Sequence, residues 1–187
     1  MCIRDRLYDL YDRPAWLEKL LEHCTEVAIA FAQAQVEAGA TIIGLGDAIA
    51  SQISPEAYRR YALPYEQRIF EAVRTAGAVP RLHICGNTSR IVEDMARSGA
   101  QIIDLDWMVD LAAARAQVDA IDPTIALCGN FDPVAVLYRG APDTVRAAAR
   151  ACRAAGGMNW LAAPGCEVPR YTPAENMHAL QEALSDD

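Results

Sequence analysis

The amino-acid sequence predicts an α/β protein built on a parallel sheet. Stretches with helical periodicity end at glycine in residues 37–40, 75–78, 97–100 and 153–157, and glycine suits the left-handed position that follows a helix. A short apolar run follows each of these glycines. Alternating helical and strand-like segments are typical of parallel sheets with right-handed crossovers. The runs are almost continuously apolar, as expected for strands with both faces covered.

Five strands are expected, four after these glycines and one after a proline that breaks the chain. Their ranges are 41–47, 79–86, 101–106, 124–130 and 158–166. Both a doubly wound sheet and a (β/α)8 TIM barrel are built from such units. Five units are too few to close a barrel, which needs roughly 200 residues or more. If the fold is a barrel, the chain is expected to be its C-terminal part.

The helices between the strands have recognisable starts. One long helix is expected over residues 14–38. Ser54 and Pro55 provide an N-cap and a first-turn proline for a helix whose apolar face continues to Ile69. The other expected starts are Thr88 or Ser89, Asp110, Pro142 and Thr172.

Composition excludes several classes of function. The net charge of −8 argues against a nucleic-acid or anionic-membrane surface. The chain has no apolar stretch long enough to span a membrane. Its N-terminal residues are charged and lack the apolar core of a signal peptide, which favours a cytoplasmic protein. In that compartment the six cysteines are expected to be thiols or metal ligands rather than disulfides.

Polar residues with useful chemistry follow the ends of the expected strands. Ligands gather at the carboxyl ends of the strands in either parallel architecture. In strand order, the residues there are Asp47; His83 and Cys85; Asp104 and Asp106; Cys128, Asn130 and Asp132; and Cys166 and Glu167. Two thiols, one imidazole and several carboxylates are therefore expected to meet at one rim.

A zinc site explains this set better than a nucleophile. His83 and Cys85 share a strand face, and Cys166 lies at the end of another strand. One His and two Cys are the three protein ligands of a catalytic zinc with an open fourth position. Two thiolates and a neutral imidazole would leave Zn²⁺ formally neutral, so a bound thiolate would stay nucleophilic. The alternative is that these are core residues, since cysteine is often a small buried hydrophobe.

For other polar residues the sequence allows either a role in the site or a purely structural role. One of Asp104 and Asp106 is expected to face the rim, beside the ligands or as a fourth ligand, and the alternative is helix capping. Asp47, Asp106 and Asn130 are the residues expected to contribute to cofactor binding. Arg81 either orients an anionic group or is a solvated surface residue.

Several segments resemble a known family. They are HICGNTSRIVEDM, DLDW, CGNFDPVAVLYRGAPDTV and APGCEVPRYTPAENMHAL. Over roughly residues 38–184 the chain resembles the uroporphyrinogen decarboxylase superfamily. Within it, the chain is most similar to the corrinoid-dependent methyltransferases of the methylcobamide:coenzyme M type.

The resemblance implies a fold and a reaction. The fold would be a TIM barrel, of which residues 1–187 would form a single domain with the last five βα units. His83, Cys85 and Cys166 would be the catalytic zinc ligands. A thiol small molecule would take a methyl group from a methylated corrinoid, a cobalamin-type cofactor carried by a separate corrinoid protein. Residues 1–6 resemble no family start and are expected to be non-native. Open barrel edges would favour self-association.

Two other functions stay open at this point. One is a tetrapyrrole decarboxylase of the uroporphyrinogen type, which needs no metal but needs a pocket with arginine for the substrate carboxylates. The other is a catalytically inactive truncated chain that keeps a structural zinc site. Structural zinc sites normally have four protein ligands, so a fourth ligand would favour that reading.

Overall fold

The computed structural model of the chain describes residues 3–185, and its centre is a five-stranded parallel sheet. The strands follow one another across the sheet in chain order, β1-β2-β3-β4-β5. They are β1 (Ile42–Gly46), β2 (Val79–Ile84), β3 (Ile102–Leu105), β4 (Ala126–Cys128) and β5 (Trp160–Leu161). A doubly wound sheet reverses its strand order at a switch point, and this sheet does not. The five expected strands are confirmed.

The last strand is much shorter than the expected run over residues 158–166. β5 is only two residues long, although Phe131 and Pro164 still form an isolated parallel bridge. Pro164 has no backbone N–H to donate to a ladder. The N–H of Gly165 donates to the carbonyl of Phe131 at 2.9 Å, so the segment stays beside β4 without continuing the strand.

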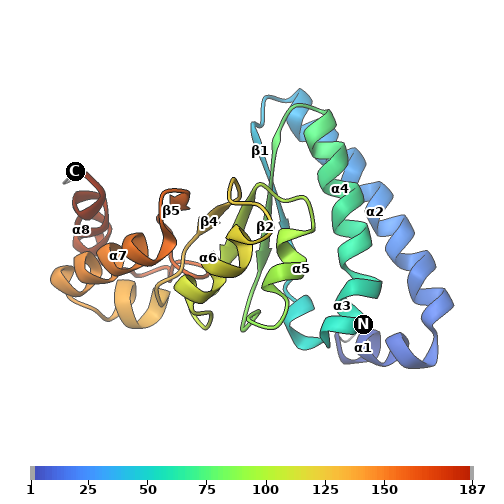
Figure 1. The fold of residues 1–187 in the computed structure, drawn as a ribbon, viewed down its shortest axis with the longest axis horizontal. Helices are drawn as coiled ribbons and strands as arrows, with labels where there is room; N and C mark the ends of the chain where they lie inside the picture. Colours follow the sequence, from blue (N-terminus) through green and yellow to red (C-terminus); the bar gives the residue numbers. More distant parts are fainter. Residues whose placement is uncertain (1–2, 186–187) are drawn as a thin grey trace.

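Helices connect the strands, and Figure 1 shows the sheet running between α2 and α4 at one end and α7 and α8 at the other. The α-helices are α1 (Ile3–Asp12), α2 (Pro14–Glu37), α3 (Pro55–Tyr61), α4 (Leu63–Thr75), α5 (Val92–Ala96), α6 (Leu111–Asp119), α7 (Pro142–Gly156) and α8 (Ala174–Ser185). Two short helical turns, η1 (Ala50–Gln52) and η2 (Pro133–Tyr138), precede α3 and α7. Within the described residues, no helix combines the length and the hydropathy that a membrane span requires.

Four expected helix starts agree with the structure, at Pro14, Ser54, Asp110 and Pro142, and two expectations were wrong. Ser54 accepts a hydrogen bond from the N–H of Ala57, and Asp110 accepts one from Ala113. The helix expected to run from Ser54 to Ile69 is split into α3 and α4, because Pro64 has no N–H for an intrahelical bond. The helix expected to start at Thr88 or Ser89 is the short α5, whose N-cap position carries no side-chain hydrogen bond.

The main core lies between one face of the sheet and the helices. Sequential strands with right-handed crossovers place every connecting helix on the same side of a sheet. Strand residues of that face are buried in one cluster with helix residues: Ile43, Leu82, Ile84, Ile103, Leu105 and Leu127 with Phe70, Val73, Met95 and Val118. A smaller cluster joins η2, α7 and α8. The expectation that both strand faces are covered is therefore wrong for this chain.

The other face, called the inner face below, carries polar residues in register. Gly46 pairs with His83, His83 with Asp104, and Asp104 with Cys128 across four neighbouring strands. Arg81 lies two residues before His83 and shares its face. The parallel arrangement thus places a cation, an imidazole, a carboxylate and a thiol next to one another. The prediction that residues 1–6 are non-native is untested, and residues 1–2 lie outside the described residues.

Candidate metal centre

Cys85 follows the last residue of β2 and is held by the turn after it. Gly86 has a φ of 86°, a left-handed conformation that favours glycine. Its N–H donates to Asp106 Oδ2 at 2.8 Å, and the N–H of Met108 donates to the other oxygen at 3.1 Å. Asp106 is 4% exposed. Its carboxylate therefore ties the turn that carries Cys85 to the loop after β3.

Cys166 approaches Cys85 because Gly165 packs against the backbone of the same loop. A Cβ atom at Gly165 would lie only 2.2 Å from the backbone nitrogen of Trp107. Asn130 supports the loop from the other side, donating to the carbonyls of Asp106 at 2.9 Å and Val109 at 2.6 Å. These contacts connect the ends of β2, β3, β4 and β5 into one rim. The Pro-Gly-Cys sequence is the signal from which this close approach could have been predicted.

The described residues include one group of side chains whose ligand atoms could hold a metal: His83, Cys85 and Cys166, with all three atoms within 4.8 Å of one another. His83 Nε2 lies 3.1 Å from Cys85 Sγ, and the two sulfurs are 3.7 Å apart. Tetrahedral zinc separates two sulfurs by about 3.8 Å and a nitrogen from a sulfur by about 3.5 Å. The donor set and its spacing fit a zinc ion after a shift of a few tenths of an ångström at the imidazole.

Burial disfavours the thiolate form of two inner-face cysteines, Cys85 and Cys128. Burial, with a smaller contribution from neighbouring Cys166, raises the pKa of Cys85 to about 11. Burial also raises the pKa of Cys128 to about 12, with Asp104 adding to it. Because thiolates are the ligands of zinc, metal binding at Cys85 must release a proton. All five described cysteines are free thiols, as predicted, and Cys2 lies outside the described residues.

Asp104 faces this site and Arg81 holds it. The Nε of Arg81 donates to both carboxylate oxygens at 2.9 and 2.8 Å, and its Nη2 lies 2.7 Å from Oδ2. His83 Nδ1 is 3.7 Å from the same Oδ2. The guanidinium also lies 3.7 Å from Cys128 Sγ. Of the two aspartates that the sequence offered for the rim, Asp104 lines the cavity and Asp106 braces its loops.

The remaining predicted site residues are spread over other positions. Asn130 is buried and its amide N–H groups are taken by backbone carbonyls. Asp132 caps η2 by accepting from the N–H of Val134 and Ala135. Glu167 lines the cavity of the three ligands. Asp47 lies outside that cavity and lines an apolar one with α1 and α2. The structure therefore brings the three residues predicted as ligands together and separates them from Asp47.

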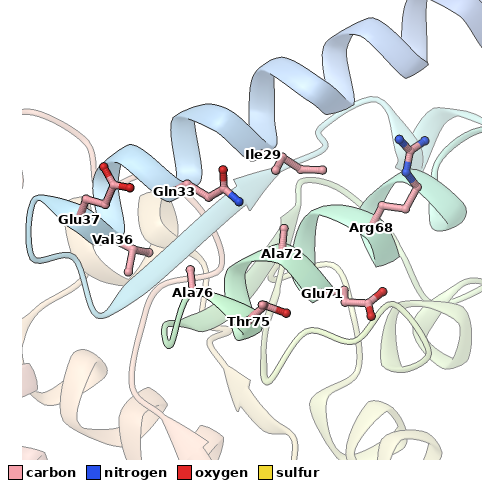
Figure 2. A pocket seen from close by; sticks show the side chains of 9 residues that line it. All are labelled: Ile29, Gln33, Val36, Glu37, Arg68, Glu71, Ala72, Thr75 and Ala76. Atoms are coloured by element: carbon pink, nitrogen blue, oxygen red, sulfur yellow. The ribbon is translucent and has the colours of Figure 1, made fainter.

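Two cavities open on the inner face. One, of about 440 Å³, is lined by the three candidate ligand residues with Arg81, Asp104, Ala163, Pro164 and Glu167. The other, of about 380 Å³, shares Arg81, His83 and Asp104 with the first and is lined by Gly44 and Gly46 on β1. A larger crevice of about 970 Å³ lies between α2 and α4, where Figure 2 shows Ile29, Gln33 and Val36 facing α4. No histidine or cysteine lines that crevice, so its chemistry differs from that of the inner face.

The chain is similar in sequence to known methyltransferases and decarboxylases. A profile of the family described as Uroporphyrinogen decarboxylase (URO-D) matches residues 3–186. A methylcobamide:CoM methyltransferase MtbA from Methanosarcina mazei is 38% identical over 89% of this chain and 48% of its own length. A uroporphyrinogen decarboxylase from Nocardia farcinica is 39% identical over 75% of this chain and 38% of its own length.

The fold of the chain also matches a solved structure. A structure described as a methyltransferase from Methanosarcina mazei superposes with a TM-score of 0.88 at 30% identity, covering 98% of this chain and 53% of that one. The chain therefore spans about half the length of the relatives it matches. Methyltransferases and decarboxylases are about equally identical to it, so overall similarity does not separate the two activities.

Proposed function

Because the chain belongs to the uroporphyrinogen decarboxylase family, we propose that it forms the C-terminal part of a (β/α)8 barrel with a methyltransferase site. The sequential parallel strands support the barrel, since each strand of a barrel pairs with its neighbours in the chain. The polar row of the inner face then lies at the carboxyl end of the barrel, where active sites of this fold are found.

The reaction that we propose is the transfer of a methyl group from a methylated corrinoid to a thiol. The observation that carries it is the cluster of His83, Cys85 and Cys166. One imidazole and two thiolates are the three-ligand set of a catalytic zinc. Zinc in such a site lowers the pKa of a substrate thiol, so that the thiolate forms near neutral pH. The MtbA relative is named for a methylcobamide donor and CoM as acceptor.

Several residues of the chain would have separate roles in this reaction. His83, Cys85 and Cys166 would hold the metal and carry the negative charge that keeps the bound thiolate nucleophilic. Asp106 and Gly165 would keep the two cysteines within reach of one ion. The cavity of about 440 Å³ beside them leaves space for the acceptor thiol. The methyl carbon would be attacked by sulfur, and the cobalt of the corrinoid would keep the electron pair of the broken bond.

A metal-free decarboxylase is the second candidate, favoured by the similarity to the Nocardia farcinica enzyme. That reaction must bind several substrate carboxylates, which calls for unpaired cations. Among the described residues that line the ligand cavity, Arg81 is the one arginine, and Asp104 already accepts its hydrogen bonds. The cavity is therefore better suited to a metal than to a polycarboxylate.

The deciding experiment measures the zinc content of the chain purified after growth with added zinc. Two variants, each with one cysteine replaced, are measured in the same way. We expect about one zinc per chain in the parent and markedly less in Cys166→Ser. Cys24→Ser removes an exposed thiol far from the cluster in sequence and is expected to match the parent. Methylcobalamin and a panel of thiols then test methyl transfer. A folded parent chain that contains no zinc although zinc was supplied would overturn the proposal and favour the decarboxylase.

Self-association is part of the same proposal. β1 and β5 are the two outer strands of the sheet, and unpaired strand edges tend to pair with other chains. Ile42 on β1 is 49% exposed. We expect the isolated chain to form oligomers at high concentration, which light scattering over a dilution series would detect.

A further inference from the structure

The two ring nitrogens of His83 have different neighbours. Nε2 lies 3.1 Å from Cys85 Sγ, on the side of the metal cluster. Nδ1 lies 3.7 Å from Asp104 Oδ2, on the side of β3. The register of the sheet fixes this arrangement, because His83 and Asp104 are direct partners on adjacent strands. One imidazole therefore bridges the thiol cluster and a carboxylate.

Only one protonation state of the ring suits both neighbours. A neutral imidazole carries a proton on one nitrogen and a lone pair on the other. The nitrogen that binds a metal must be the unprotonated one, which leaves the proton on the other nitrogen. If Nε2 is the ligand, the proton belongs on Nδ1, next to Asp104. The same state allows the Cys85 thiol to donate to Nε2 before metal binds.

Arg81 determines which way the Asp104 carboxylate faces. Its Nε and Nη2 contact the carboxylate from the same strand face that carries His83. Oδ2 is shared between the guanidinium and the imidazole. The Asp104 side chain is 13% exposed, so little water competes for that oxygen. Arg81 thus compensates the buried charge of Asp104 and also orients it.

We propose that Asp104, held by Arg81, is a positioning residue that keeps the His83 proton on Nδ1 and presents Nε2 to the metal. The proposal rests on the metal site described above and adds a role for two residues outside the ligand set. Asp106 does not fill this role, because both its oxygens accept backbone N–H groups. Asp104 is also not in the described group of metal ligands. Carboxylate partners of this kind orient metal-bound histidines in other proteins.

Asp104→Asn is the sharpest variant, because it removes the charge beside Nδ1 and keeps the shape of the side chain. Oδ2 accepts from Arg81 and also faces His83, so the amide oxygen that takes its place still serves both neighbours. Without the carboxylate charge the preference for a proton on Nδ1 weakens, and the fraction of the ring with its proton on Nε2 rises. The matched control is Asp94→Asn. Asp94 on α5 accepts from the Nε of Arg59 on α3 at 3.1 and 2.9 Å, which is an equivalent ion pair.

Two measurements on the purified chain test the proposal separately from the metal site. The first is the ¹⁵N spectrum of the three histidines without metal, with His83 assigned by the signal lost in His83→Gln. We expect the proton on Nδ1 in the parent and in Asp94→Asn, and a larger fraction of the ring with its proton on Nε2 in Asp104→Asn. The second is zinc affinity by competition with a chelator, where we expect Asp104→Asn to lose about 10- to 100-fold.

The outcomes are distinct. Asp104→Asn with the parent's ring tautomer and zinc affinity would overturn the inference and leave the metal site intact. A parent that binds no zinc would contradict the proposed function, while the ring spectrum would still decide the role of Asp104. If Asp104→Asn fails to fold, Arg81→Gln keeps the carboxylate and frees its orientation. It is expected to shift both measurements in the same direction by less, and no shift in either would overturn the inference.

Discussion

Two clusters of titratable side chains lie at the same end of the sheet but on opposite faces. On the inner face, Asp104 is paired with Arg81 and faces His83. On the helix-covered face, Asp47 and Glu66 form a carboxyl pair, and the Tyr58 hydroxyl donates to Glu66 Oε2 at 2.5 Å. Strand alternation explains the separation, because Asp47 has the parity of Ile43, which points into the core.

The two clusters handle buried negative charge differently. Asp104 is paired with the guanidinium of Arg81, which compensates its charge. Glu66 is 3% exposed and meets another carboxyl group, so two negative charges there would repel each other. Among the described residues, no donor reaches Glu66 Oε1. That oxygen is satisfied if it carries the proton itself and donates to Asp47. The inner cluster can thus face a ligand. The cluster of Asp47, Glu66 and Tyr58, called the outer cluster, can hold a proton.

Replacing a proposed metal ligand should give the largest difference in zinc affinity between variants of the two clusters. Cys85→Ser removes one of the proposed zinc ligands from the inner cluster. It should weaken zinc binding by more than about 100-fold, which is the most that a residue hydrogen-bonded to a ligand typically contributes. Glu66→Gln changes the other cluster and should leave zinc affinity unchanged. Chelator competition on both variants measures the difference. Equal losses in the two variants would mean that the clusters are not independent.

The pH dependence of stability should come from the helix-covered cluster. Burial raises the pKa of Glu66 from 4.5 to about 8. Between these pH values the folded chain holds a proton that the unfolded chain has released, so stability falls as pH rises. The loss should be on the order of a few kcal/mol, at about 1.4 kcal/mol per pKa unit. Below the unfolded pKa the contribution of Glu66 is fully present.

Glu66→Gln should remove this dependence, because an amide keeps both hydrogen bonds and does not ionise. Urea unfolding at about pH 5 and about pH 9 measures it. We expect the variant to exceed the parent at the higher pH and to match it at the lower one. Glu71→Gln, an exposed change on the same helix, should follow the parent. A parent whose free energy of unfolding does not fall over this range would show that Glu66 ionises normally.

Gly165→Ala tests whether close packing brings Cys166 to Cys85. The new Cβ would lie 2.2 Å from the backbone nitrogen of Trp107, so the loop must move. We expect a loss of about 1–3 kcal/mol in stability together with weaker zinc binding. Gly44→Ala is the control, since a Cβ there meets nothing within 4 Å. Unchanged zinc affinity in Gly165→Ala would mean that the Cys166 loop adapts without losing the site.

Much of the fold and of the inner cluster was readable from the sequence. Glycine after a helix marked four of the five strands, and strand alternation placed His83 and Cys85 together. The split at Pro64 also had a sequence signal, since proline interrupts a helix, but the apolar face across it was more prominent. The two-residue β5 depends on Pro164, which removes the ladder donor in a run that otherwise resembles a strand.

The rest depends on contacts between distant segments. Asp104 and Asp106 are two residues apart and look equivalent in the sequence, yet one meets an arginine from β2 and the other meets loop N–H groups. Glu66 resembles a surface residue of α4, and only the packing of α3 and α4 on the end of β1 buries it. Periodicity predicts which face a residue occupies but not which partner it finds there.

Tyr58→Phe should have the smallest effect of these variants and tests the last link in the outer cluster. Tyr58 is fully buried, and its hydroxyl donates to Glu66. Removing the hydroxyl leaves Glu66 Oε2 without that donor, which costs about 1–3 kcal/mol for a buried group. Tyr138→Phe, at a residue that is 40% exposed, should change stability by less than about 0.5 kcal/mol. Because phenylalanine cannot stabilise a Glu66 carboxylate, the loss in Tyr58→Phe should grow as pH rises toward the pKa of Glu66. A loss that is the same at every pH would mean that the hydroxyl contributes packing alone, and the outer cluster would then consist of the carboxyl pair without the tyrosine.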